Sequence, residues 1–467
     1  MAKLFFICTI FVIIFFQTTK AQDSIPLLKG KVTISITKGT IDCDFTLSSM
    51  PRIEDYVIRI NSGMNILYFK NLDANNLIYF DKSFSDTLSS GESNAYYFGN
   101  NKGNGKFLPH AIQFRYMGMY PVVKDTLKEY GVEDWKGNIA FNGYSVRTDG
   151  RQSAWYPVLY DIKRDLVYEK VKCDIEVNCA DCNTIYISGN PPVKSSTAHF
   201  KNDVPTQLTM YSGKYKVANV AGTYFLNPDI NDKQLKEFGG MTNAFKAFYE
   251  SKIGISYKDA ITYIQTTPTS KYNAWMFVSY PSIVNIGYGK YGLISFFDKK
   301  TGDWFKPYMA HELGHYYFGT VKIFNAELGD MMSEGFAEYL SLQVTRELIN
   351  DSIYKKKITE KIKALKDFSA VAMGKVRSKS DYRNRELYVY YYAPLIFTAI
   401  EKEIGLPKMW QWIKAIIETK TAFTNYDFLV KTLATAVQDD TKMGLIKSKY
   451  LNSDKAVENA TAIIQQQ

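Results

Sequence analysis

Two histidines and a glutamate lie close together in the segment PYMAHELGHYYFG, residues 307–319. On a helix, His311 and His315 lie one turn apart on the same side, with Cβ atoms about 6 Å apart. Two imidazoles so placed can bind one small divalent cation, and Glu312 lies beside them, where it reaches the metal's water rather than the metal. In such sites zinc acidifies the water and the glutamate takes its proton. The pattern predicts a catalytic zinc centre with Glu312 as general base.

A catalytic zinc ion needs a third protein ligand and one open position for water. Glu334, in the segment MMSEGFAEYLS, lies 334 − 315 = 19 positions after the second histidine and is the candidate. We expect it on a second helix that packs against the first, with Asp330 as the cap of that helix. Glu338, one turn beyond Glu334, either orients a ligand histidine or faces solvent.

The segments HELGHYYFG and SEGFAEY, at this spacing, resemble the metal site of the aminopeptidase N family. These membrane alanyl aminopeptidases are gluzincins, a group to which a leukotriene hydrolase also belongs. Their metal site is His-Glu-x-x-His, eighteen residues, then Glu. The resemblance implies one zinc ion bound by His311, His315 and Glu334, with Glu312 as general base.

The family also carries a catalytic tyrosine ahead of a long apolar helix that ends in LExxxG. Aligning Glu401 and Gly405 with that ending places Tyr390 in the tyrosine position. A phenol there can donate a hydrogen bond to the oxyanion that forms when water attacks the carbonyl. Since three further tyrosines lie between 388 and 392, an aromatic core face is the alternative interpretation.

The segment YGLISFF, from residue 291, resembles the family's WGLITY edge strand, along which substrate backbones lie. The resemblance implies substrate contacts at and just before this strand, from Gly287, Tyr288, Gly289, Tyr291 and Gly292. In the aminopeptidases, a glutamate before the strand binds the free amino group of the substrate. Gly289 occupies that position here and Lys290 follows it, and neither residue supplies the carboxylate that pairs with an ammonium.

The spacing of apolar and turn residues along the chain indicates two kinds of structure. From about 30 to 190, short alternating runs such as KVTISIT and IDCDFTL lie between turn residues, which predicts an all-β saddle or sandwich domain over 22–200. After a few strands, helical stretches predominate, which indicates an α+β domain over 201–467. We expect DKQLKEFGGMTNAFKAFYESKIG to form two helices separated at Gly239-Gly240.

The resemblance implies that residues 201–467 form a thermolysin-like catalytic domain. Only 467 − 405 = 62 residues follow Gly405. We therefore expect the large C-terminal helical domain of the family to be absent, which would leave a more open cleft.

The N-terminus has the features of a secretory signal. Lys3 precedes an apolar run from Leu4 to Phe16, and small residues at Thr19 and Ala21 predict cleavage after Ala21. The run is shorter than the ~20 apolar residues that span a membrane. We expect a periplasmic or secreted protein, with residues 1–21 removed and no stable membrane insertion.

Composition narrows the class of protein and the kind of partner it binds. With 467 residues, 46% hydrophobic and 22% charged, the chain can form two domains with sizeable cores. The net charge is +10, but the lysine-rich stretch at 354–368 is not accompanied by a nucleic-acid motif, so the expected partner is a peptide or protein substrate. Cys43, Cys173, Cys179 and Cys182 remain after signal cleavage and permit two disulfides, whose pairing the sequence does not reveal.

Three functions follow from these observations. The first is an exported zinc metallopeptidase of aminopeptidase N type. The second is an endopeptidase, or a hydrolase of blocked peptides, because Gly289 replaces the amine-binding glutamate. The third is a non-catalytic, zinc-containing envelope binding protein. Glu312 argues against the third, because a structural zinc site uses four protein ligands and no base.

Overall fold

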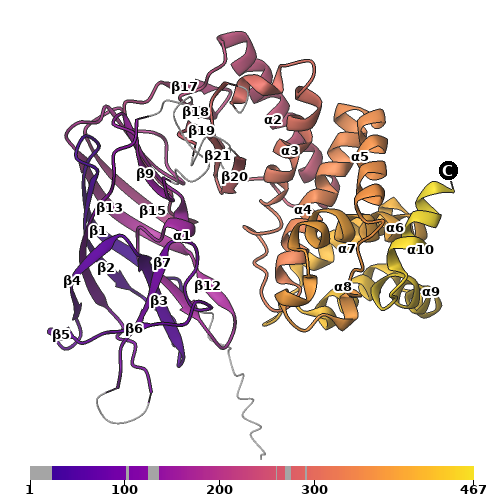
Figure 1. Cartoon of the computed structure of the whole chain (residues 1–467), viewed down its shortest axis with the longest axis horizontal. Helices are drawn as coiled ribbons and strands as arrows, with labels where there is room; N and C mark the ends of the chain where they lie inside the picture. The colour runs from indigo at the N-terminus through magenta and orange to yellow at the C-terminus, as the bar shows by residue number, and fades with distance from the viewer. Residues whose placement is uncertain are drawn as a thin grey trace, which may run out of the picture.

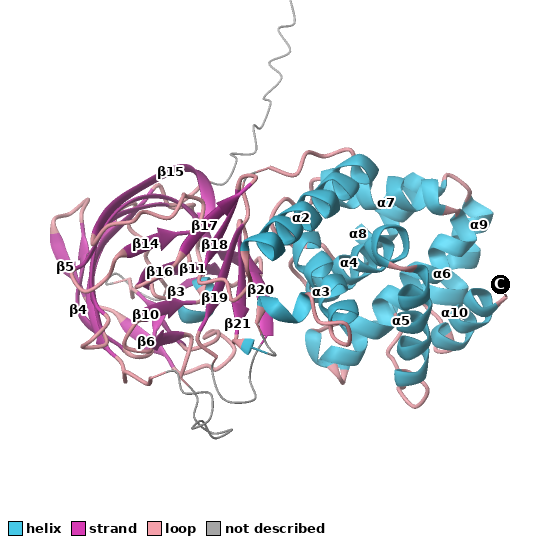
Figure 2. Ribbon diagram, turned by 90° about the horizontal axis from the view of Figure 1, so that it is seen from above, coloured by secondary structure: helices cyan, strands magenta, loops and turns pink. Residues whose placement is uncertain are grey.

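Strands make up the N-terminal half of the chain and helices most of the C-terminal half (Figures 1 and 2). The computed structural model describes residues 24–100, 105–124, 136–258, 260–268, 275–289 and 292–466. The predicted signal peptide, residues 1–21, lies outside the described residues. A chain of β-sheets followed by a mixed, mainly helical part agrees with the expected fold class. The predicted domain limits and the expected absence of a further helical domain stay predictions.

A seven-stranded sheet forms the outer wall of the β half (Figure 2). Its strands, in spatial order, are β15 (Thr197–Gln207), β13 (Lys170–Cys179), β1 (Leu27–Ser35), β2 (Thr40–Ser48), β8 (Ile112–Met119), β4 (Met64–Asn71) and β5 (Asn76–Ile78). β1 and β13 run parallel, and the other neighbours run antiparallel. In β2 every second residue is buried, so the alternation seen in the sequence marks the face that lies on the core.

Two smaller sheets complete the β half. One contains β12 (Leu166–Tyr168), β11 (Val158–Asp161), β3 (Tyr56–Asn61), β7 (Ser93–Tyr97) and β6 (Asp81–Ser83). The other contains β14 (Thr184–Ile187), β16 (Met210–Gly213), β10 (Ser145–Thr148) and β9 (Ile139–Phe141), and the short helix α1 (Gly150–Ser153) follows β10. Position 200 lies within β15, and β15 and β16 both pair with strands of these N-terminal sheets.

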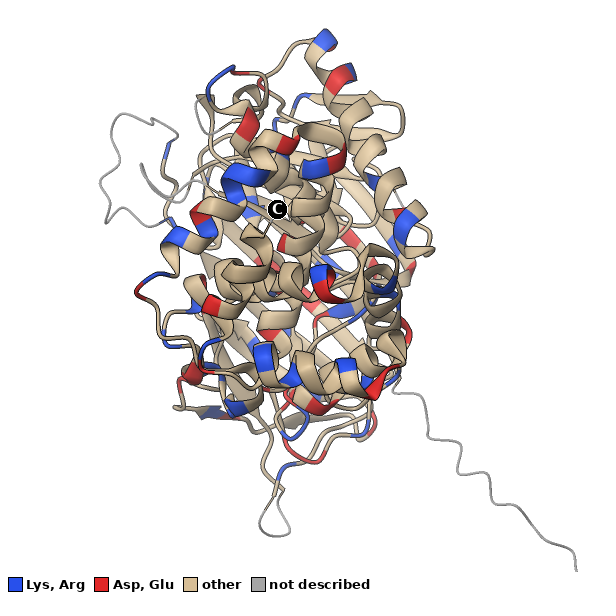
Figure 3. Ribbon diagram, turned by 90° about the vertical axis from the view of Figure 1, so that its right-hand side faces the viewer, with Lys and Arg blue, Asp and Glu red and all other residues tan. Residues whose placement is uncertain are grey.

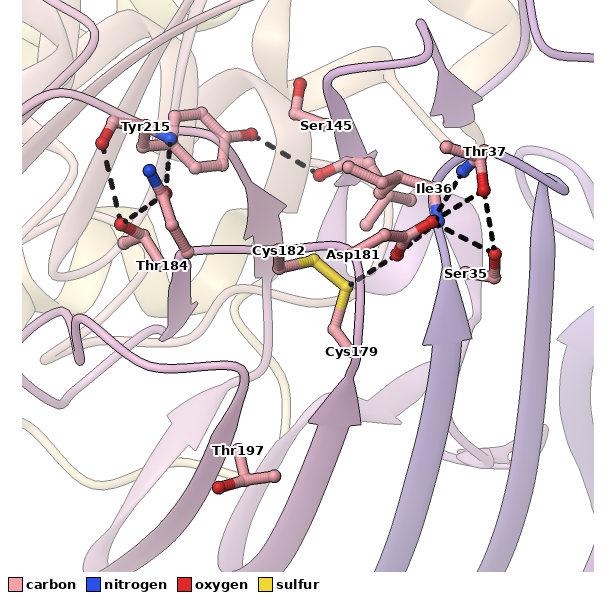
Figure 4. The surroundings of a disulfide bond; sticks show 12 residues. Ser35, Ile36, Thr37, Ser145, Cys179, Asp181, Cys182, Thr184, Thr197 and Tyr215 are labelled. Atoms are coloured by element: carbon pink, nitrogen blue, oxygen red, sulfur yellow. Dashed lines mark hydrogen bonds between the residues drawn. A yellow bond between two sulfur atoms is a disulfide. The ribbon is translucent and has the colours of Figure 1, made fainter.

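One disulfide closes the turn between β13 and β14 (Figure 4). It joins Cys179 to Cys182, while Cys43 and Cys173 are buried free thiols. Asp181, inside the bridge, accepts hydrogen bonds from the backbone N–H groups of Ile36 and Thr37 at 3.0 and 2.9 Å. The bridge and the carboxylate therefore fix this turn against the end of β1.

A five-stranded sheet begins the second half. Its order is β17 (Val217–Val220), β18 (Thr223–Leu226), β19 (Thr262–Thr266), β21 (Ser282–Ile286) and β20 (Trp275–Ser279). β20 pairs antiparallel with β21 and forms an edge of the sheet. The pairs β18–β19 and β19–β21 are parallel, and the inner strands β19 and β21 are buried along their length.

Helix α2 (Asp232–Ile253) covers this sheet and corrects one expectation. It is a single helix, so the predicted break at Gly239-Gly240 is wrong. Leu235, Phe238 and Phe245 keep a buried stripe at helical spacing on both sides of the glycines. An Asn231 capping box fixes the start of the helix, and packing of the continuous apolar stripe outweighs the ~1 kcal/mol that each glycine costs.

The remaining helices form the body of the C-terminal half. They are α3 (Gly302–Gly314), α4 (Gly329–Val344), α5 (Asp351–Ala364), α6 (Ala393–Ile404), α7 (Leu406–Glu418), α8 (Tyr426–Val437), α9 (Asp440–Ile446) and α10 (Ala456–Gln465). A π-helical segment, Leu387–Tyr392, leads into α6. Acidic and basic residues are interspersed over this half (Figure 3). Among the described residues, none of the helices combines the length and the apolar character that a bilayer crossing requires.

Two glycines allow the helices around α4 to approach closely. A Cβ on Gly314 of α3 would lie 3.3 Å from the Ala337 backbone of α4. A Cβ on Gly335 of α4 would lie 2.8 Å from the Ala393 side chain at the start of α6. Larger side chains would push these helices apart. The close approach brings together the C-terminal end of α3 and the first turns of α4.

Polar contacts join the two halves near the end of α3. The Lys170 ammonium, at the start of β13, donates hydrogen bonds to the backbone carbonyls of Gly319 and Thr320 at 3.2 and 2.6 Å. The Asn325 side-chain amide donates to the Arg164 carbonyl at 2.9 Å. Both contacts involve the segment that connects α3 to α4, so the β half directly supports this connection.

Candidate active site

The two histidines of the HELGH segment face one another at the end of α3. Their Nε2 atoms are 3.1 Å apart, and their rings lie 4.8 Å apart, edge to face. His311 is 4% exposed, and Glu312, which follows it, is 5% exposed. The helical spacing predicted from the sequence therefore brings His311 and His315 to a common point.

Glu334 reaches the same point from the second turn of α4. Its Oε2 atom lies 3.3 Å from Nε2 of His311 and 3.3 Å from Nε2 of His315. A tetrahedral zinc ion with bonds of about 2.0–2.1 Å would hold its ligand atoms roughly 3.3 Å apart. The three atoms thus have the spacing of three corners of a zinc tetrahedron, and the donor set of two imidazoles and one carboxylate fits that metal.

The other ring nitrogens of both histidines are also hydrogen-bonded. Nδ1 of His311 lies 3.0 Å from Oε2 of Glu338, and Nδ1 of His315 lies 3.1 Å from the Phe318 carbonyl. Because these acceptors hold a proton on Nδ1, the Nε2 atom of each ring has a lone pair for a metal once the ring is neutral. Of the two interpretations of Glu338, the structure shows the first, in which this residue orients His311.

Lys361 of α5 extends this network. Its ammonium donates to Oε1 of Glu338 at 2.7 Å and to the backbone carbonyl of Tyr390 at 2.6 Å. The sequence analysis did not identify Lys361, because its stretch of lysines looks like a solvated helix face. The signal that was present is the spacing of Tyr354, Ile358 and Lys361, which places this lysine on the buried side of the helix.

We expect the change Glu338→Gln to weaken zinc binding about 10- to 100-fold, because a neutral amide holds the His311 proton less strongly than a carboxylate does. The measurement is competition for zinc against a chelator of known affinity. Glu347→Gln, at a half-exposed position beyond α4, is the matched control and should bind zinc like the unmodified protein. An unchanged zinc affinity in Glu338→Gln would mean that this contact does not orient the histidine.

Burial and mutual pairing shift the pKa values of these groups. Burial opposes protonation of His311, but hydrogen bonds to Glu334 and Glu338 outweigh it and raise the pKa of His311 to about 10. Burial also opposes ionisation of Glu334, yet the two histidines hold its pKa well below the usual value. Burial raises the pKa of Glu312 to about 7, against the attraction of the two histidines. Glu312 is thus the carboxylate whose affinity for a proton is matched to neutral pH.

Tyr390 lies beside the histidines, as the alignment predicts. Its ring centroid is 5.8 Å from that of His311, and the guanidinium carbon of Arg385 is 5.7 Å from the tyrosine ring. Of the tyrosines between 388 and 392, Tyr388 and Tyr392 are buried in the core. The structure therefore separates the run into two core members and two partly buried members, Tyr390 and Tyr391, which line the cavity, and Tyr390 is the one beside His311.

Asp330 does not cap α4, so that expectation is wrong. The helix begins one residue earlier, at Gly329, without a side-chain cap. Asp330 instead accepts two hydrogen bonds from Arg385, at 2.7 and 2.8 Å. Arg385 also lies 3.5 Å from Oε1 of Glu334, the oxygen that does not face the histidines. The pair thus directs the other oxygen of Glu334 towards the histidines.

A cavity of about 1300 Å³ opens beside these residues. Its wall includes α3, α4, α5, the edge strand β20, and residues of the β half such as Asp149, Glu169 and Gln207. Aromatic side chains contribute much of it, including Trp304, Tyr308 and Tyr390. A cavity of this size, with a few polar groups beside the histidines, has the dimensions of a ligand site.

The segment that was expected to form the substrate-binding strand does not form a strand. Residues Leu293–Phe296 form a 3-10 helix, so the expected strand from residue 291 is wrong. Local hydrogen bonds explain this, because Ser295 N–H donates to the Gly292 carbonyl and Ile294 N–H donates to the Asp229 carboxylate. The edge strand beside the histidines is β20.

The residues expected to bind substrate therefore do not line the cavity where the structure describes them. Gly287, Tyr288 and Gly289 follow the inner strand β21, and Gly292 precedes the 3-10 helix. Tyr291 and Lys290 lie outside the described residues. Sequence reasoning missed β20 because Trp275–Ser279 lacks a family motif, although its apolar, aromatic composition is typical of a strand.

Comparison with known proteins gives structural likeness without sequence likeness. No family model matches the sequence, and no curated protein matches it. The M1 zinc metallopeptidase of Deinococcus radiodurans, solved as a mutant bound to a Tyr-Ser-Ala substrate, is similar with a TM-score of 0.60 and 12% identity, over 91% of this chain and 93% of that one. A two-domain M1 zinc metallopeptidase bound to L-arginine has a TM-score of 0.58 at 12% identity, over 91% and 93% of the chains.

Leukotriene A4 hydrolase from Saccharomyces cerevisiae is similar with a TM-score of 0.60 and 14% identity, over 90% of this chain and 66% of that one. At such identities the likeness establishes the fold. At the level of the fold, the resemblance expected from the sequence is confirmed.

Proposed function

We propose that this chain, which has the fold of the M1 zinc metallopeptidases, is an exported zinc metallopeptidase that hydrolyses peptide bonds. The proposal rests on the convergence of His311, His315 and Glu334 on one point, next to the buried carboxylate of Glu312. A structural zinc site would need a fourth protein ligand in place of such a base. Export rests on residues 1–21, and N-terminal sequencing of the secreted product should find Gln22 as the first residue.

The residues of the candidate site have separate roles in the proposed reaction. Bound zinc would polarise the scissile carbonyl and lower the pKa of a water towards about 7. Glu312 accepts the proton of the attacking water and passes it to the leaving nitrogen. Burial raises the pKa of Tyr390, so its phenol keeps its proton and can donate a hydrogen bond to the oxyanion.

The edge strand supplies a place for the substrate. β20 pairs on one side with β21, so an extended peptide would lie along its outer side, where Tyr308 and Glu312 of α3 bond the Met276 carbonyl and the Val278 N–H. Because β20 lines the same cavity as the histidines, a peptide on this strand would pass in front of them. A digest of a broad peptide library, with zinc-loaded and chelator-treated protein, tests the proposal. The expected result is zinc-dependent internal or terminal cleavage, and no cleavage would favour a zinc-containing binding protein.

The structure also offers an argument for the second function, hydrolysis within peptides or of blocked peptides. β20, the edge strand that lines the cavity, contains no acidic residue. Away from the histidines, the acids that line the cavity are Glu360 and Glu386 of the helical half and two acids of the β half, each of which is paired with an arginine. Asp149 lies 3.2 Å from Arg147, and Glu169 lies 3.2 Å from Arg151. Neither carboxylate is free to hold a substrate ammonium at full strength.

We therefore expect a peptide and its N-acetylated form to be cleaved with kcat/KM values within about threefold of each other. An ammonium that lost a dedicated, desolvated carboxylate partner would lose about 2 kcal/mol or more, which is roughly 30-fold in kcat/KM. Mass spectrometry of timed digests gives both the rates and the cleaved bonds. A preference for the free amine above about 30-fold would contradict this expectation and would favour an aminopeptidase.

A further inference from the structure

The groove beside β20 has a defined direction. The Tyr308 hydroxyl of α3 donates to the Met276 carbonyl at 3.1 Å, and Val278 N–H donates to the Glu312 carboxylate. β20 and α3 therefore run in the same direction, with the end of β20 at Trp275 towards the start of α3. At the other end of the strand, the Ser279 hydroxyl donates to Gln207 of β15 at 2.8 Å, so the β half closes that end.

A lysine and a tryptophan lie at the Trp275 end of the groove. Trp304 and Lys357 both line the cavity, and the Lys357 ammonium is 4.9 Å from the centre of the indole ring. Trp304 lies 311 − 304 = 7 residues before His311 on the same helix, which is ~10 Å along the axis. Lys357 lies one turn before Lys361 on α5, which places both ammoniums on the side of α5 that faces the cavity.

Lys357 carries a positive charge that the described residues do not neutralise by an ion pair. Among those residues, no carboxylate lies within 4 Å of its ammonium, whereas Lys361 pairs with Glu338 at 2.7 Å. Burial lowers the pKa of Lys357, Glu338 opposes this shift, Lys361 lowers the pKa further, and Glu360, which also lines the cavity, opposes it. An indole ring stabilises a cation but leaves room for an anion beside it. A carboxylate from a ligand would supply the missing partner.

The position of this cation relative to the histidines sets which carboxylate it would meet. Antiparallel pairing with an edge strand is the slightly more stable arrangement, and it would place the C-terminal side of a bound peptide at the Trp275 end. An extended peptide covers ~10 Å in about three residues. We propose that Lys357 and the Trp304 ring form a subsite for a peptide carboxylate about three residues C-terminal to the cleaved bond. This proposal rests on the proposed peptidase function.

Such a carboxylate has two sources, the C-terminus of a short peptide and an acidic side chain of a longer one. Four peptides of one length distinguish them, namely a free acid, its C-terminal amide, and two amides with Asp or Asn in the third position after the cleaved bond. Zinc-loaded wild-type protein should cleave the free acid, the Asp amide, or both, with a kcat/KM about tenfold above that of its neutral counterpart. Equal values in both pairs would overturn the proposal.

Substitutions assign the effect to one residue. Lys357→Met should remove the preference, and Lys357→Glu should reverse it in favour of the neutral peptide. Lys363→Met, on the exposed side of the same helix and outside the cavity, should keep the tenfold preference. A preference that survives Lys357→Met would overturn the proposal, and the charge-reversal variant provides the same test if the methionine variant does not fold.

A binding measurement separates this inference from the peptidase function. Calorimetry with the zinc-loaded Glu312→Gln variant should show about tenfold tighter binding of the acidic peptide, even if wild-type protein cleaves neither. In that outcome the peptidase function fails and the subsite stands. If wild-type protein cleaves both peptides and the variant binds them with equal affinity, the peptidase function stands and the subsite fails. No binding of either peptide would also overturn the subsite.

Discussion

Glu312→Gln is expected to retain one zinc ion per chain and to lower kcat/KM for peptide hydrolysis by about 10³- to 10⁴-fold. Glutamine has nearly the same shape as glutamate, and Glu312 is buried beside the metal ligands without being one of them, so the site should keep its geometry. The amide, however, cannot accept the proton of the attacking water. The loss should therefore appear in kcat rather than in the metal content.

Two measurements check this expectation together. Elemental analysis gives the zinc content, and the peptide identified in the library digest gives kcat and KM. Glu418→Gln, at an exposed position on α7, serves as the control and should leave both quantities unchanged. Wild-type turnover in Glu312→Gln would refute the assignment of Glu312 as base, and loss of zinc from this variant would mean that the residue also holds the metal.

His315→Ala is expected to lose stoichiometric zinc and to abolish measurable hydrolysis. A catalytic zinc ion bound by three residues depends on each of them, and Nε2 of His315 lies 3.1 and 3.3 Å from the other two ligand atoms. The other histidines offer a matched control. His199 is an exposed residue of β15 that pairs with Asp174, and His199→Ala should keep both zinc and activity. Stoichiometric zinc in His315→Ala would contradict the proposed ligand set.

Zinc affinity should also depend on pH, with a sign that follows from the histidine pKa. The pKa of His311 is raised to about 10, so this ring is protonated at neutral pH when metal is absent. A zinc ion can bind only after that proton leaves. The apparent affinity should therefore fall by about tenfold for each unit of decreasing pH between 8 and 6, for one released proton. Chelator competition at three pH values measures this slope, and a flat profile would contradict it.

The placement of the histidines and of Glu312 could be predicted from the sequence because their spacing is local. His311, Glu312 and His315 belong to one helix, and the helical repeat alone places them together. Glu334 required one further step, the packing of α4 on α3, which the flanking residues indicated through their resemblance to a known motif. Tyr390 followed from an alignment to Glu401 and Gly405 in the helix that comes after it.

Other parts of the site depend on contacts that no local pattern encodes. Lys361 looks like one lysine among several, and its role comes from Glu338 on another helix and a carbonyl near Tyr390. The edge strand β20 carries no motif, and its position depends on the order of strands in the sheet. The segment from residue 291 resembled a strand by its letters, yet hydrogen bonds to Asp229 and within the turn determine its conformation. Tertiary contacts outweighed local preference in each case.

The contact between Lys170 and the carbonyls of Gly319 and Thr320 ties the β half to the backbone beside a proposed zinc ligand. These carbonyls come only a few residues after His315, so any hinge-like separation of the β half from the helical half would pull directly on the backbone that carries this imidazole. A separation of the two halves would therefore disturb the geometry of the proposed metal site.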